Sequence, residues 1–113
     1  MAFSTKITAT DSDGGSALDI EVPWWNDDEL RRDPRFAESE ENLGYLDYRA
    51  SLSAQEVQEL SDRYRTRLSD GVDPETGKLW YERWHRDQRQ LEAALKQPDF
   101  SYSIWVFEWE SGM

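Results

Sequence analysis

The segment that most constrains how this chain can fold is Ser101–Trp109, near the C-terminus, with the sequence S-Y-S-I-W-V-F-E-W. Successive side chains of a strand project to opposite faces. Here both faces receive large apolar side chains: Tyr102, Ile104 and Val106 on one, and Trp105, Phe107 and Trp109 on the other. We therefore expect a central strand that is covered, at least in part, on both sides.

Two alternating segments near the N-terminus predict an antiparallel hairpin. Phe3–Thr10 and Leu18–Trp24 alternate apolar and polar residues, and a turn-forming stretch, 11–16, joins them. Pro23 cannot donate a backbone hydrogen bond, so it predicts an edge position or a strand end. A third strand is predicted over Leu43–Leu52. Its inward residues are Leu46, Tyr48, Ala50 and Leu52, and its outward residues are Tyr45, Asp47 and Arg49.

Two helices are predicted between the third strand and the last. Ser53 followed by Glu56 forms a capping-box signature, and this helix extends to about Ser69. The second runs from about Lys78 to Gln97. Apolar residues recur at helical spacing in both: Val57, Leu60, Tyr64 and Leu68 in the first, and Trp80, Trp84, Leu91, Ala94 and Leu95 in the second.

The predicted fold class is α+β, in the order β-β-β-α-α-β. We expect one domain over residues 1–113, built from an antiparallel sheet of about four strands with two helices packed on one face. The last strand should lie beside the first or the third, since either position would make it central.

The polar stretch Trp25–Asn42 interrupts these patterns. We expect a long exposed loop there, with a short helical turn possible around Asp28–Arg32. Trp24 and Trp25 are adjacent, and adjacent strand residues face opposite ways. One of the two tryptophans should therefore lie outside, beside this loop.

Composition excludes several classes of protein. The chain has no cysteine, which excludes disulfides and thiolate metal sites. It contains no apolar run of the roughly 20 residues that span a bilayer, and its N-terminus lacks the apolar core of a signal peptide. We therefore expect a cytoplasmic protein that does not bind membranes. Its net charge of −11 opposes direct nucleic-acid binding and favours a basic partner, although solubility alone could explain it.

No pattern indicates catalysis, a metal site or a cofactor. His85 is the only histidine, and no nucleophile motif accompanies it. Asp11-x-Asp13-Gly14 begins like a calcium loop, but its later ligand positions are Gly15 and Val22, so a turn explains it. Glu108 and Glu110 are expected to be solvated charges at a strand end.

Charge is unevenly distributed along the chain. Between Asp19 and Asp47 there are ten acidic and three basic residues, a net charge of −7, whereas the helical region 54–97 has a net charge of −1. We expect the acidic segment to bind a basic protein, with aromatic residues as anchors. The predicted partner-binding residues are Trp25, Asp27, Asp28, Glu29, Phe36, Glu38, Glu40 and Glu41.

A small, acidic, cysteine-free domain without a catalytic signature resembles the immunity proteins with which bacteria neutralise their toxins, many of which are nucleases with basic clefts. The resemblance is one of general character over the whole chain, and it implies an inhibitor that blocks a toxin's active site. Two alternatives stay open. One is a DNA-mimic or phage-type inhibitor of a nucleic-acid-binding protein, and the other is a small enzyme or ligand-binding domain with an aromatic pocket.

Overall fold

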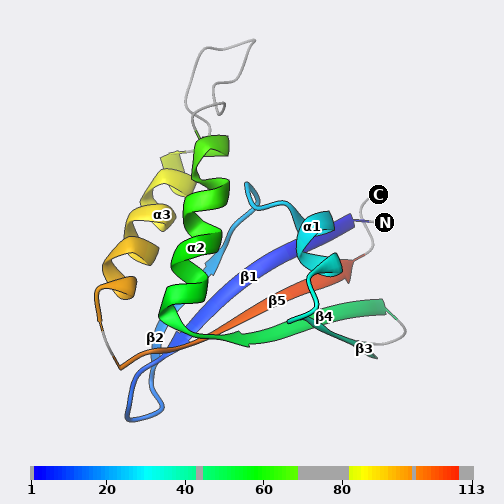
Figure 1. Ribbon diagram of the computed structural model, residues 1–113, viewed down its shortest axis with the longest axis horizontal. Helices are drawn as coiled ribbons and strands as arrows, with labels where there is room; N and C mark the ends of the chain where they lie inside the picture. The colour runs from blue at the N-terminus through cyan, green and yellow to red at the C-terminus, as the bar shows by residue number, and fades with distance from the viewer. Residues whose placement is uncertain (1, 43–44, 69–81, 98, 110–113) are drawn as a thin grey trace.

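The computed structural model describes residues 2–42, 45–68, 82–97 and 99–109, with side chains except at positions 2, 39–42, 45, 82 and 109. Within these ranges the chain forms one antiparallel sheet with helices packed against it, as Figure 1 shows. The predicted α+β class is confirmed.

The described sheet has five strands: β1 (Ala2–Thr10), β2 (Ser16–Glu21), β3 (Ala37–Asn42), β4 (Tyr45–Leu52) and β5 (Ser101–Trp109). Their order across the sheet is β2-β1-β5-β4-β3. The C-terminal strand β5 is therefore central, as predicted, and it pairs with both expected neighbours. Its register with β1 includes Ile7 opposite Ile104, and its register with β4 includes Ala50 opposite Ile104.

The prediction of about four strands was one short, because β3 lies inside the stretch predicted as a loop. Its sequence, A-E-S-E-E-N, has no apolar alternation that could mark it as a strand. An edge strand needs only backbone pairing on one side, and β3 pairs with β4 at Ala37–Arg49, Glu38–Tyr48 and Ser39–Asp47.

The hairpin between β1 and β2 is confirmed, and its turn is built around Asp11. The Asp11 Oδ1 atom accepts hydrogen bonds from the backbone N–H groups of Asp13, at 2.9 Å, and Gly15, at 2.8 Å. Gly14 adopts a φ of 83°, a conformation that other residues rarely adopt. The acidic motif thus serves the turn. At its other end β2 stops at Glu21, two residues before Pro23.

Three α-helices are described: α1 (Asp27–Arg32), α2 (Ala54–Tyr64) and α3 (Glu82–Leu95), and a 3₁₀ turn, Arg65–Leu68, extends α2. The capping box of α2 is confirmed. The Glu56 N–H donates to Ser53 Oγ at 3.2 Å, and the Ser53 N–H donates to Glu56 Oε1 at 3.1 Å. Residues 78–81 of the second predicted helix, Trp80 among them, lie outside the described residues, as does Leu43. None of the described helices is long and apolar enough to cross a bilayer.

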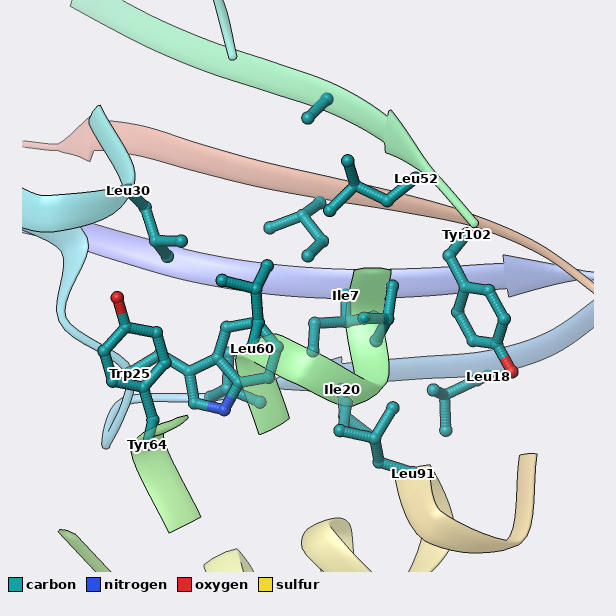
Figure 2. Close-up of a cluster of buried hydrophobic side chains, with 14 of the residues drawn as sticks. Ile7, Leu18, Ile20, Trp25, Leu30, Leu52, Leu60, Tyr64, Leu91 and Tyr102 are labelled. Atoms are coloured by element: carbon teal, nitrogen blue, oxygen red, sulfur yellow. The ribbon is translucent and has the colours of Figure 1, made fainter. Parts of the chain in front are cut away.

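The core fills the space between one face of the sheet and the helices (Figure 2). Side chains from β1, β2, β4 and β5 meet side chains from all three helices there. The labelled members are Ile7, Leu18, Ile20, Trp25, Leu30, Leu52, Leu60, Tyr64, Leu91 and Tyr102. Leu91 and Ile104 are fully buried, as predicted, whereas Trp84 is only partly buried.

In the described part of the chain the two faces of β5 are covered unequally. Tyr102, Ile104 and Val106 are buried against the helices, whereas Trp105 and Phe107 on the other face are only partly buried. The described helices all pack on one face, and we call the other the open face. Glu108 shares the helix-covered face and is buried, so the expectation of a solvated charge was wrong for Glu108, whereas Glu110 lies outside the described residues.

Candidate partner-binding surface

The acidic segment begins with a helix whose first turn holds three acidic residues. Asn26 caps α1, and its Oδ1 atom accepts hydrogen bonds from the N–H groups of Asp28, at 3.1 Å, and Glu29, at 3.2 Å. Negative charge in the first turn stabilises a helix by interacting with its dipole. The short helical turn predicted from the sequence is therefore present, and its acidic residues stabilise it.

The two arginines in the last turn of α1 pair with its aspartates. Arg31 Nη2 lies 3.3 Å from Asp28 Oδ1 and 3.9 Å from Asp27 Oδ1, and Arg32 Nη2 lies 2.9 Å from Asp28 Oδ2. Such exposed pairs contribute little to stability. The arginines do, however, offset the negative charges of Asp27 and Asp28. These two predicted site residues therefore attract a basic partner less strongly than the sequence suggests.

A second ion-pair cluster ties the acidic segment to α2. Arg35 Nη2 lies 2.6 Å from Asp33 Oδ2, and Arg35 Nη1 lies 3.2 Å from Glu56 Oε2. The hydrogen bond from the Arg35 side chain lowers the pKa of Asp33. The pKa of Glu56 is also lowered, first by the backbone N–H of Ser53 and then by Arg35. All three arginines of the acidic segment are therefore already engaged by carboxylates.

Glu29 is exposed and contacts α2 through a different group. The Tyr64 hydroxyl donates a hydrogen bond to Glu29 Oε2 at 2.8 Å. Burial, and then this bond to a carboxylate, raise the pKa of Tyr64. Because the Tyr64 phenol carries no positive charge, this contact does not offset the charge of Glu29 as the arginines offset those of Asp27 and Asp28.

The remaining predicted acids belong to edge strand β3. Glu38 is exposed there, opposite Tyr48 of β4. Glu40 and Glu41 occupy the same strand, but their side chains lie outside the described residues. The sequence of β3 contains three glutamates and no basic residue.

The predicted aromatic anchors, Trp25 and Phe36, are core residues. Their exposed fractions are 3% and 7%, and the Trp25 ring packs on Tyr64 with ring centroids 5.6 Å apart. Trp24 is buried as well, against Trp84. The expectation that one tryptophan lies outside assumed strand alternation. A turn in which the Trp25 N–H donates to the Val22 carbonyl ends that alternation.

The open face of the sheet carries a surface that the sequence did not identify. Trp105 and Phe107 of β5 pack together there, with ring centroids 4.4 Å apart. The Arg49 guanidinium lies 4.6 Å from the Trp105 ring centroid. Asp47, opposite Phe107, completes the group. Finding this surface requires knowing that β4 and β5 are neighbours and in which register.

Asp47 was expected to face outward, and it does lie on the open face, but it is only 1% exposed. Neither carboxylate oxygen has a hydrogen-bond donor within the part of the chain that the structure describes. The nearest cation is Arg49, whose Nη2 atom lies 3.6 Å from Asp47 Oδ2. Burying a charge with so little compensation is costly, so this carboxylate is a weak point of the fold.

Other candidates from the sequence form no recognisable centre. His85 is half-buried and lines an open hollow of about 260 Å³ with Arg65, Gln88 and Glu92. Among the described residues, no three potential ligands gather where a metal ion could bind. Two hollows lined by described residues are open grooves at the surface.

Comparison with known proteins found no similarity: no protein-family model, curated protein or solved structure matches this chain.

Proposed function

We propose that this protein binds and inhibits a basic protein partner in the cytoplasm, as immunity proteins do with toxins. One observation carries the proposal. The three basic residues of the segment Asp19–Asp47, namely Arg31, Arg32 and Arg35, already form ion pairs with neighbouring acids. The acidic residues that outnumber these arginines therefore carry negative charge that can attract basic residues of a partner protein.

The proposed contact surface is narrower than the one predicted from the sequence. It consists of Glu29 on α1 and the glutamates of edge strand β3: Glu38, Glu40 and Glu41. Glu29 and Glu38 are exposed, and surface carboxylates attract a basic protein from a distance and accelerate its association. Asp27 and Asp28 contribute less to this field because arginines offset them, and Trp25 and Phe36 stabilise the fold instead.

The packing of the core also supports a protein-binding function rather than the binding of a small ligand in an enclosed pocket. The buried apolar side chains of the described residues form one core, which includes the rings of Trp24 and Trp25. An aromatic pocket with convergent polar groups would favour a ligand-binding domain, whereas two of the hollows between described residues, of about 470 and 460 Å³, are open grooves.

Binding kinetics with charge variants test the proposal. The partner is first captured from cells that carry the gene and identified by mass spectrometry. Its association is then measured by stopped flow at two salt concentrations. The triple variant Glu38→Gln/Glu40→Gln/Glu41→Gln should associate about tenfold more slowly at low salt and show a flatter salt dependence.

A matched control separates local from overall charge. The triple variant Glu59→Gln/Asp62→Asn/Asp99→Asn removes three charges from exposed positions away from β3. It should associate nearly as fast as the wild type. Equal slowing by both triple variants would assign the effect to net charge alone, and unchanged rates in the β3 variant would overturn the proposed surface.

A further inference from the structure

A groove runs between edge strand β2 and helix α3, at the edge of the sheet farthest from β3. One half has a volume of about 470 Å³ and is largely apolar, with walls that include Ala17, Leu18, Ala93, Ala94 and Phe100. The other half, of about 460 Å³, is polar and includes Arg83 and Arg86. Asp19 and Gln90 line both halves, so the groove is continuous along the strand.

The strand that borders the groove has free backbone groups. In the described structure β2 pairs only with β1, and Figure 1 shows it at the outer edge of the sheet, on the side where α2 and α3 lie. The Val22 N–H donates to the Thr5 carbonyl at 2.9 Å. Backbone groups alternate in direction along an antiparallel ladder, so those of Ile20 also face β1. The N–H and C=O groups of Asp19 and Glu21 therefore face outward.

Charges differ on the two sides of this edge. On the α3 side, Arg83 and Arg86 are exposed, and neither forms an ion pair with a described residue. On the open-face side stand Asp19 and Glu21, both exposed, and Lys6 offsets only Asp19, at 3.0 Å. An added strand would project alternate side chains to these two sides.

We propose that this groove binds an extended peptide, which adds to β2 as a sixth strand. The peptide has basic side chains toward Asp19 and Glu21. Toward α3 it has an acidic side chain beside Arg83 and Arg86, followed by apolar side chains in the half lined by Ala93 and Phe100. A second copy of the chain fits poorly. Symmetric pairing of two β2 strands through the outward groups of Asp19 and Glu21 would set acid opposite acid.

A designed peptide tests this site directly. The acetylated and amidated hexapeptide Lys-Glu-Lys-Val-Thr-Val, antiparallel to β2 with its first residue opposite Glu21, matches both sides of the groove. The control peptide Glu-Lys-Lys-Val-Thr-Val has the same composition and net charge, but its first two charges are exchanged. Titrations followed by ¹⁵N NMR should show at least about tenfold tighter binding of the first peptide.

Two further measurements locate the binding. The first peptide should slow hydrogen exchange of the Asp19 and Glu21 amides, whereas the Ile20 amide, bonded to β1, should change little. The exposed-site variant Arg83→Glu/Arg86→Glu should remove most of the preference for the first peptide, because its acidic second residue then lies beside acidic side chains. Equal affinity for both peptides, unchanged exchange at Asp19 and Glu21, or a dimer of the free protein by ultracentrifugation would each overturn the proposal. None of these outcomes bears on the β3 surface, at the opposite edge of the sheet.

Discussion

The two faces of strand β5 have similar apolar content but different surroundings. On one face Ile104 and Val106 are fully buried beneath the helices. On the other, Trp105 and Phe107 pack mainly on each other and on Arg49, and they keep part of their surface exposed. Apolar residues alone therefore do not show which face of a strand forms the core. The position of the helices decides it, because only a covered face is removed from water.

The same comparison separates the residues that stabilise the fold from those that remain accessible to solvent. Residues on the helix-covered face contribute most of the burial, and their replacement should damage the fold. On the open face Trp105 and Phe107 remain partly accessible, whereas Asp47 is buried and its carboxylate has no hydrogen-bond donor among the described residues. Two predictions test this contrast, and a third tests the ion-pair cluster around Arg35.

The largest expected effect comes from truncation on the covered face. Ile104→Ala should lower the free energy of unfolding by about 2–5 kcal/mol, because the packed core cannot fully close the resulting cavity. Trp105→Ala removes a larger side chain, but from the open face, and should cost only about 1–2 kcal/mol. Urea unfolding followed by circular dichroism measures both. A loss from Trp105→Ala as large as that from Ile104→Ala would show that the two faces are equally buried in solution.

An effect of the opposite sign is expected at Asp47. Asp47→Asn removes a buried charge that has no hydrogen-bond donor among the described residues, so the free energy of unfolding should rise by about 1 kcal/mol. Arg49→Gln removes the cation nearest to Asp47 and should lower the free energy of unfolding. Urea unfolding of the two single variants supplies the comparison. Destabilisation by Asp47→Asn would mean that the carboxylate is well compensated and that the open face is more ordered than these contacts indicate.

The smallest expected effect concerns pH and the ion-pair cluster that joins the acidic segment to α2. The pKa values of Asp33 and Glu56 are lowered in the folded protein, in each case partly by Arg35. A lowered folded-state pKa adds stability above the unfolded pKa of about 4, and this stability is lost as the pH falls through the folded-state value. Arg35→Gln should therefore destabilise the protein slightly at pH 7, and the difference from wild type should vanish near pH 2.

Thermal unfolding across this pH range measures the difference, and Lys96→Gln, which removes an exposed cation outside the cluster, is the control. Its difference from wild type should depend less on pH. If the Arg35→Gln difference were the same at both ends of the range, the link between Arg35 and the two carboxylates would be refuted.

Local patterns in the sequence predicted much of the fold because short-range physics decides them. Ser53 and Glu56 cap α2 through groups three residues apart, and Asp11 closes the β1–β2 turn through neighbouring amides. Alternation identified β1, most of β4 and β5. Strand β3 was missed because its polar sequence carries no alternation, and its pairing with β4 holds it in place.

The candidate surface was predicted only in part, because contacts between distant segments cannot be read from local patterns. The sequence shows where acidic residues are concentrated, since charge can be counted along a chain. It did not predict that Trp25 and Phe36 are buried or that arginines offset Asp27 and Asp28. Those outcomes depend on where α1 packs and on the turn that precedes it.

The sequence by itself thus determined the α+β class, the central position of β5, the helix cap at Ser53 and the acidic character of residues 19–47. Tertiary structure alone decided which face of β5 is covered, which carboxylates remain without an arginine, and which strand edge borders a groove. The physical reason is the separation along the chain of the groups that interact. Capping, turn formation and strand alternation involve groups a few residues apart, whereas burial, ion pairing between elements and free edges depend on segments that only the folded chain brings together.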